Sequence, residues 1–214
     1  MKRGLHISVD GPSGVGKSTL LRGLDAALRT AGHTIHTTCS PSMSDIGAFA
    51  RKQVDTARGV VLACLMAADL YRNQADVIQP QLAQGTTVLA DRGLASSLVM
   101  QRLDGVDVEF LQALSIYAVP ADLTVILTAD VPVVRDRLLS RGTHNRYQDQ
   151  DDSSLRECRY FNDAATYLAD VRGLNVLRLD TTCLKPDDVL NAVLDELQDL
   201  SNAKPLITTA GESR

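Results

Sequence analysis

The chain has 214 residues, of which 44% are apolar and 22% charged, and its net charge at pH 7 is −4. This size and composition predict one soluble globular domain, and the acidic balance disfavours a nucleic-acid surface, because phosphate backbones attract basic faces. No apolar run reaches the roughly 20 residues that span a bilayer, and the N-terminus leaves no room for a signal peptide. The four cysteines form no Cys-x-x-Cys pair, so we expect reduced thiols in a cytoplasmic protein, without a disulfide framework or a zinc site.

Short apolar strand patterns alternate with amphipathic helix patterns along the chain. The segments expected to be strands are 5–10, 33–38, 87–90, 123–127 and 176–179. The longest expected helix covers 60–84, with a bend at Pro80. Others are expected between the first two strands, where Gly32 ends the helix, and from Pro186 onward. This alternation indicates an α/β fold in which βαβ units build a parallel sheet of five strands, covered by helices on both faces.

One domain is expected over residues 1–200. Within it, residues 142–154 are polar and turn-rich, which predicts a flexible flap, or LID, rather than core. Residues 201–214 offer little to bury, which predicts a disordered tail.

A glycine-rich loop follows the first expected strand. Residues 11–18 read Gly-Pro-Ser-Gly-Val-Gly-Lys-Ser and fit the pattern G-x-x-x-x-G-K-[ST] in full, with a strand before it and a helix after it. Backbone N–H groups of such a loop form a nest for phosphate oxygens, Lys17 supplies a point charge to the β- and γ-phosphates, and the Ser18 hydroxyl ligates Mg²⁺. ATP and Mg²⁺ are therefore the expected cofactors. The residues expected to bind them are Gly11, Ser13, Gly14, Val15, Gly16, Lys17, Ser18 and Thr19.

A carboxylate and an arginine, Asp91 and Arg92, stand where the third expected strand ends. Ligands of open α/β sheets bind at the carboxyl ends of the strands, so this pair is expected to face the phosphate site. Asp91 would hold Mg²⁺ or its waters, and the guanidinium of Arg92 would hold an acceptor phosphate. The alternative interpretation is a structural ion pair at a strand end.

Phosphoryl transfer spreads negative charge over the equatorial oxygens, which an arginine can stabilise. The phosphate loop has no arginine at its variable positions, so the flap region is expected to supply one. Arginines in and beside the flap are Arg137, Arg141, Arg146, Arg156 and Arg159. Arg141 and Arg146 are the two predicted to be catalytic, although any single one of these arginines equally fits a solvated helix face.

The phosphate loop alone does not separate nucleotide kinases from other nucleotide-hydrolysing enzymes. A GTPase would carry an Asn-Lys-x-Asp motif for reading the base, and the sequence contains none. A motor or transporter ATPase would be longer and would carry a signature motif. These absences from the sequence favour a kinase of a small molecule.

Further motifs lie beyond the loop, and with them the chain resembles the thymidylate kinase family from about Leu5 to Leu197. The most particular are Asp91-Arg92 with Ser96 and Gln101, and the string Pro-x-Asp-Leu-Thr-Val-Ile-Leu that begins at Pro120. Others are Ser40-Pro41 with Gly47 and Arg51, Val77-Ile-Gln-Pro-x-Leu-x-x-Gly85, and Arg137 to Gly142 with Arg146.

This resemblance implies the three-layer fold of P-loop nucleoside monophosphate kinases and a homodimer packed through helices. It also implies ATP-dependent conversion of a pyrimidine deoxynucleotide monophosphate, a small-molecule acceptor, to its diphosphate. Arg92 would hold the acceptor phosphate with help from Arg51, and Gln101 would approach the base. The residues expected to bind the acceptor are Arg51, Asp69, Arg72, Arg92, Ser96 and Gln101.

The sequence departs from the family in two places. Cys39-Ser40-Pro41 replaces the usual Arg-Glu-Pro, and Leu70 stands where the family has an arginine that bonds the pyrimidine. A site built to bond a polar base edge discriminates strongly, so we expect an acceptor other than plain dTMP. Asp69 could accept from the exocyclic amine of a cytosine-type or modified base, or could be a solvated helix residue.

Two other functions remain open from the sequence. A deoxynucleoside kinase would need a carboxylate base after the second strand, where the glutamate is missing. A nucleotide-binding regulatory protein without transfer chemistry is favoured by the same replacement at Cys39-Ser40.

Overall fold

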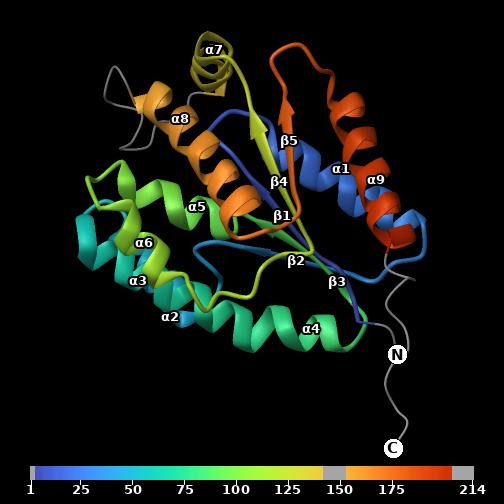
Figure 1. Ribbon diagram of the computed structural model, residues 1–214, viewed down its shortest axis with the longest axis horizontal. Helices are drawn as coiled ribbons and strands as arrows, with labels where there is room; N and C mark the ends of the chain where they lie inside the picture. The colour runs from blue at the N-terminus through green and yellow to red at the C-terminus, as the bar shows by residue number, and fades with distance from the viewer. Residues whose placement is uncertain (1–2, 142–152, 204–214) are drawn as a thin grey trace, which may run out of the picture.

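The computed structural model describes residues 3–141 and 153–203 (Figure 1). Its sheet consists of β1 (His6–Asp10), β2 (Ile35–Cys39), β3 (Thr87–Asp91), β4 (Leu123–Thr128) and β5 (Val176–Asp180). All neighbouring strands are parallel, and their order is β2-β3-β1-β4-β5. The predicted parallel sheet of five strands is confirmed, with strand ends shifted by two residues at most.

Helices connect the strands. In the first half of the chain they are α1 (Lys17–Thr30), α2 (Asp45–Gln53), α3 (Gly59–Asn73), the π-helical turn η1 (Gln74–Ile78), α4 (Gln79–Ala83), α5 (Leu94–Val99) and the 3-10 turn η2 (Met100–Arg102). In the second half they are α6 (Val108–Leu114), α7 (Val131–Arg141), α8 (Ser153–Thr166), the π-helical turn η3 (Tyr167–Val171) and α9 (Pro186–Ala203).

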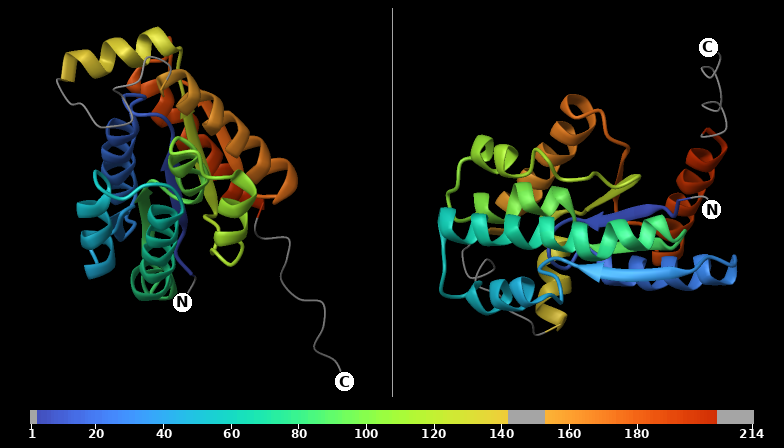
Figure 2. Two further views of the ribbon diagram at one scale, coloured as in Figure 1. Left: turned by 90° about the vertical axis from the view of Figure 1, so that its left-hand side faces the viewer. Right: turned by 90° about the horizontal axis from the view of Figure 1, so that it is seen from below.

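The molecule has three layers, because helices cover both faces of the sheet. On one face, α1 and α9 pack with the sheet around a core that includes Leu24, Leu127 and Val193. On the other face, α3, α5 and α8 pack around a second core that includes Ile126 and Phe161. In both views of Figure 2, α1 and α8 lie on opposite sides of the sheet. The predicted fold class is confirmed.

The central strands are buried because both of their faces are covered. Every residue of β1 is buried, as are the first five of β4, which reads Leu-Thr-Val-Ile-Leu-Thr. Near-continuous apolar runs are typical of such doubly covered parallel strands. The carboxyl ends of β1 and β3 therefore stand side by side at one edge of the sheet, with Val9 paired to Asp91.

The helix predicted over 60–84 is continuous from Gly59 to Ala83, but it widens into the π-helical turn η1 just before Pro80. There the Gln79 N–H donates to the Gln74 carbonyl, five residues back. Proline has no N–H to donate and crowds the carbonyl four residues before it, and a wider turn relieves that crowding.

Two predicted boundaries are wrong. Ser153 and Ser154, expected in the flap, are the first residues of α8, and Ser154 is buried. Residues 201–203, expected in the tail, are the last turn of α9, which continues because Leu200 still packs against the core. The rest of the expected flap and tail lies outside the described residues.

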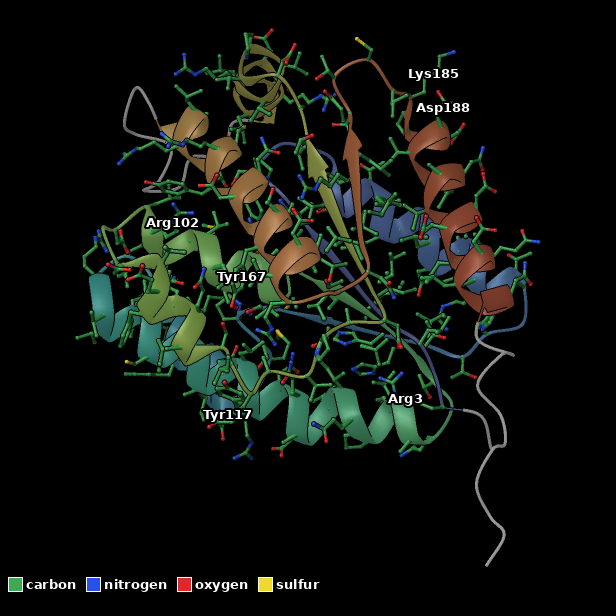
Figure 3. The ribbon with its side chains drawn as sticks, in the orientation of Figure 1. Arg3, Arg102, Tyr117, Tyr167, Lys185 and Asp188 are labelled. Atoms are coloured by element: carbon green, nitrogen blue, oxygen red, sulfur yellow. The ribbon has the colours of Figure 1, made fainter. Side chains whose placement is uncertain are left out.

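Contacts from η2 hold α8 over α5 (Figure 3). The Arg102 guanidinium carbon lies 3.9 Å from the centroid of the Tyr160 ring, and its Nη1 is 3.2 Å from the Asp163 carboxylate. This packing fixes the position of α8 relative to the carboxyl end of the sheet. No helix in the described parts of the chain has the length and hydropathy needed to cross a membrane.

A buried histidine makes the fold sensitive to acid. Burial lowers the pKa of His6 from 6.5 to about 4, and the nearby Asp122 carboxylate opposes this shift only in part. The unfolded chain binds a proton near pH 6.5, whereas the folded chain does not until about pH 4. The free energy of unfolding is therefore fully retained above pH 6.5 and falls as the pH drops toward 4.

We expect about 2 kcal/mol of this loss between pH 6.5 and pH 5. In His6→Leu this contribution disappears, so its melting temperature should fall less between pH 7 and pH 5 than that of the wild type. Calorimetry at both pH values measures the difference, whatever the absolute stability of the variant. Equal falls in both proteins would contradict the prediction.

Candidate active site

The phosphate loop lies between β1 and α1, at the carboxyl edge of the sheet. Gly11 has a φ of 137°, and a Cβ there would lie 2.4 Å from the Leu127 carbonyl oxygen, so only glycine fits. Gly16, with a φ of 112°, is the N-cap of α1. The Thr181 hydroxyl donates to the Val15 carbonyl at 3.0 Å, which ties the loop to the segment after β5. This geometry leaves the loop amides and the positive end of α1 available to an anion.

Lys17 is buried inside its own loop. Its Nζ donates to the carbonyls of Gly11 and Pro12, at 2.8 Å each. Burial, together with the positive charge of Arg92, lowers its pKa from 10.5 to about 7, and Glu157 is the strongest of the carboxylates that oppose the shift. A phosphate in the nest would strengthen the charged form of Lys17.

Asp10 is a site residue to which the sequence analysis gave no role. It is fully buried, and its Oδ1 accepts from the N–H groups of Gly93 and Ser96, both at 2.9 Å, and from the Ser96 hydroxyl at 2.6 Å. Its Oδ2 has no hydrogen-bond partner among the described residues. Its place as the last residue before the phosphate loop was a signal that could have identified it.

Arg92 has a left-handed backbone, with a φ of 73°, and its N–H donates to the Val9 carbonyl. Its Nη1 lies 3.3 Å from the Ser96 hydroxyl, which in turn donates to Asp10. A non-glycine residue in this region is strained, and such strain concentrates at functional sites. The arginine therefore belongs to a buried network that starts beside the phosphate loop.

A pocket of about 170 Å³ lies next to Arg92. It brings together three of the predicted acceptor residues, Arg92, Ser96 and Gln101. Its other walls are Ser40, Pro41, Val54, Met66, Ser97 and Met100. Arg51 is next to this pocket rather than in its lining, where its Nη2 donates to the Pro41 and Ser42 carbonyls and holds the loop after β2.

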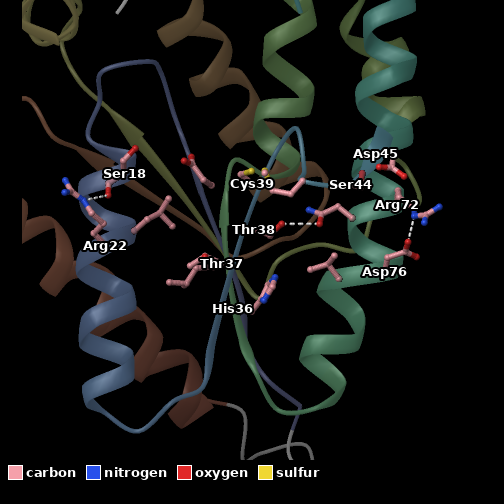
Figure 4. A pocket seen from close by; sticks show the side chains of 16 residues that line it. Ser18, Arg22, His36, Thr37, Thr38, Cys39, Ser44, Asp45, Arg72 and Asp76 are labelled. Atoms are coloured by element: carbon pink, nitrogen blue, oxygen red, sulfur yellow. Dashed lines mark hydrogen bonds and ion pairs between the residues drawn. The ribbon is translucent and has the colours of Figure 1, made fainter. Parts of the chain in front are cut away.

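A larger groove of about 900 Å³ runs along the edge strand β2 (Figure 4). Ser18 and Asp91, the two predicted metal ligands, both line it. Their hydroxyl and carboxylate oxygens are donors that suit Mg²⁺. Arg72 also lines this groove, paired with Asp76, and not the pocket of Gln101. The structure thus separates Arg72 from the other predicted acceptor residues.

The interpretation of Asp69 needs correction. Its side chain is buried, so it is not a solvated helix residue. Its Oδ2 accepts from the Ser42 N–H at 2.7 Å, and its Oδ1 accepts from the hydroxyls of Ser42 at 2.5 Å and Ser44 at 3.1 Å. The carboxylate is thus occupied by the loop before α2, and it is not free to bond an exocyclic amine.

A third pocket, of about 260 Å³, lies on the other side of the phosphate loop. Gly16, Thr19 and Leu184 line it, together with Arg137 from α7. Arg137 donates to the Thr181 hydroxyl at 3.2 Å and to its carbonyl at 2.9 Å. The phosphate loop and α7 therefore share this pocket.

Two arginines of the flap region, Arg141 and Arg146, are predicted to be catalytic. Arg141 is the last residue of α7, and its backbone alone is described. Arg146 lies outside the described residues. Of the other arginines in that region, Arg137 contacts Thr181, and Arg159 is exposed on α8.

A proton should accompany nucleotide binding. Free Lys17 has a pKa of about 7, and the phosphates of ATP raise it, so at pH 8 binding draws up to about one proton onto the amine. Titration calorimetry in buffers of different ionisation enthalpy measures this uptake. We expect it to vanish in Lys17→Ala and to persist in Lys52→Ala, an exposed lysine of α2. Binding by the wild type without proton uptake at pH 8 would contradict the assignment.

Replacing Asp69 should affect the fold and not the choice of base. Asp69→Ala leaves the Ser42 N–H without its acceptor, and we expect about 3 kcal/mol less stability. Thermal unfolding measures this, with Asp76→Ala in the adjacent η1 as the control, because its exposed ion pair contributes at most about 1 kcal/mol. A changed preference among pyrimidine nucleotides in Asp69→Ala would refute the corrected role.

Comparisons with known proteins identify the family of this chain. The profile of the thymidylate kinase family matches residues 9–190. A probable thymidylate kinase of Caldivirga maquilingensis is 31% identical over 204 residues, covering 94% of this chain and 96% of the relative. The thymidylate kinase of Deinococcus radiodurans is 32% identical over 204 residues, covering 90% and 95%. That of Leifsonia xyli subsp. xyli is 37% identical over 148 residues, covering 65% and 70%. The chain belongs to the thymidylate kinase family and is a nucleotide kinase, an enzyme that transfers a phosphoryl group.

Proposed function

We propose that this enzyme transfers the γ-phosphoryl group of ATP to a pyrimidine deoxynucleoside monophosphate, with dTMP as the first acceptor. One observation carries the proposal: the phosphate loop lines one pocket together with Arg137 and Thr181, and Arg92, whose charge acts on Lys17 of that loop, lines a second pocket together with Gln101. A donor and an acceptor nucleotide in these pockets would meet at Lys17. The choice of dTMP as the acceptor rests on the names of the relatives, which are called thymidylate kinases.

In this proposal, the donor occupies the nest from Gly11 to Thr19, and its base enters the pocket beside Arg137. The loop amides and Lys17 hold its phosphates. Ser18 and Asp91, which both line the groove, would hold Mg²⁺ through their oxygen atoms, and the cation would neutralise phosphate charge.

The acceptor phosphate binds Arg92, whose fork suits two phosphate oxygens. Ser96 and Asp10 hold this guanidinium in place through the bonds described above. Transfer then depends on positioning and charge stabilisation, because the chemistry needs little covalent help from the protein. Arg141 and Arg146 are the arginines we propose to complete the charge stabilisation.

Gln101 is proposed to read the base. It is 3% exposed, and it lines the acceptor pocket beside Met100, in the turn η2 that follows α5. The position at which the family has an arginine is Leu70, which is buried against α5 and α8. An amide presents either its oxygen or its NH₂ group to a partner, so it can bond thymine or cytosine. We therefore propose cytosine-type or modified pyrimidine monophosphates as second acceptors.

A panel of nucleotides tests the proposal. With ATP and Mg²⁺, we expect diphosphate from dTMP, slower turnover of dCMP, and little from purine monophosphates. In Gln101→Leu, kcat/KM for the acceptor should fall at least about 10-fold while KM for ATP stays the same, because only the acceptor loses a bond. Gln198→Leu, an exposed glutamine of α9, is the control.

Other results of the panel would indicate a different function or exclude part of the proposal. Phosphorylation of nucleosides instead of monophosphates would show a deoxynucleoside kinase. Tight ATP binding without any diphosphate would show a regulatory protein. If dTMP reacts much faster than every cytosine or modified nucleotide, the second acceptors are excluded.

We also propose a cytoplasmic homodimer. Large apolar side chains on and beside α2, α3 and α6 are exposed, including Phe49 and Val61. Tyr117 is 86% exposed (Figure 3). Exposed apolar side chains mark an interaction site when they form a patch. A second copy of the chain is the partner that the family resemblance suggests.

A further inference from the structure

Glu157 is a buried carboxylate for which the proposed mechanism has no role. It lies in α8, close after the first turn, and is 5% exposed. Its Oε1 accepts from the Ser13 N–H at 3.2 Å. A side chain of α8 thus reaches across to the phosphate loop.

The charges around Glu157 belong to the phosphate site. Burial raises the pKa of Glu157, and the positive charges of Arg92 and then Lys17 are the strongest of the groups that oppose this shift. Asp10 and Asp91 are the other carboxylates that act on Lys17. Two cations therefore share a poorly solvated region with three carboxylates. Buried cations need such partners when no phosphate is present.

The loop that Glu157 contacts is built to bind anions. Its N–H groups and the positive end of α1 attract negative charge, and Oε1 already occupies one of those N–H groups. We propose that Glu157 is a positioning residue that acts as a built-in anion of the empty site. It holds the Ser13 turn and balances Lys17 and Arg92, and its charge opposes the phosphates that arrive.

This inference rests on the proposed function for the identity of the acceptor. It predicts that removing the charge of Glu157 strengthens nucleotide binding, which is unusual for the loss of a buried partner. In Glu157→Gln the amide oxygen can still accept from the Ser13 N–H, but the negative charge is gone. The variant should bind anionic nucleotides more tightly than the wild type, although a buried partner has been lost. If Glu157 had a purely structural role, its replacement would weaken nucleotide binding instead.

Titration calorimetry of the full-length enzyme with ADP and with dTMP tests the direction of this change in affinity. We expect both Kd values to fall about 3- to 10-fold in Glu157→Gln, because one repulsion between nearby charges is removed. Glu157→Ala should show the same tighter binding and a lower kcat than Glu157→Gln, because it also loses the bond to Ser13. Glu109→Gln removes an exposed carboxylate of α6 and should leave both Kd values unchanged.

Unchanged or weaker ADP binding by Glu157→Gln would overturn the proposal. Weaker binding of dTMP alone would overturn it too, because Glu157 would then accept a bond from the acceptor nucleotide. Wild-type turnover of dTMP tests the proposed function separately, and the ADP titration remains decisive if another acceptor is found. Melting temperatures of the unliganded variants show that each is folded before it is titrated.

Discussion

The ammonium of Lys17 is buried, and the arrangement of the site follows from what a buried positive charge requires. Two carbonyls of its own loop accept from it, and three carboxylates surround it at some distance. The sheet makes this possible, because parallel pairing of β1 with β3 brings Asp10 and Asp91 to one edge. The glycines of the loop turn its amides toward the same place. In the proposed function, phosphates would enter a region where the charged groups are already in place, and such preorganisation accelerates transfer.

Much of the fold could be predicted because its signals are local. In β1 apolar residues alternate with polar ones, and β4 is a short apolar run, so both read as strands without knowledge of their neighbours. The spacing of glycines around Lys17 and the Ser18 hydroxyl specified a phosphate loop for the same reason. The proximity of Asp91 and Arg92 to that loop followed from one general property of parallel sheets. The sequence did not show where helices end, because packing of Leu200 and Ser154 decides those ends.

The remaining site residues depend on contacts between distant segments. Asp69 reads as an ordinary helix residue, and its role becomes evident only when Ser42, 27 positions earlier, lies against it. Arg72 is three residues further on, and the helix turns it toward a different groove. Glu157 lies 144 positions from Ser13 and carries no motif of its own. Such pairs are fixed by the way α3 and α8 pack on the sheet, which a single sequence does not display.

The left-handed backbone of Arg92 costs stability, whereas its side chain has a proposed role in binding the acceptor. Glycine adopts its left-handed conformation without the strain of about 1 kcal/mol that a larger residue suffers there. Selection for heat resistance alone would therefore favour glycine at this position. The guanidinium that the same position presents beside Ser96 works against that replacement. Position 92 is thus a place where durability and activity conflict, and thermostable descendants of this enzyme must gain their stability elsewhere in the molecule.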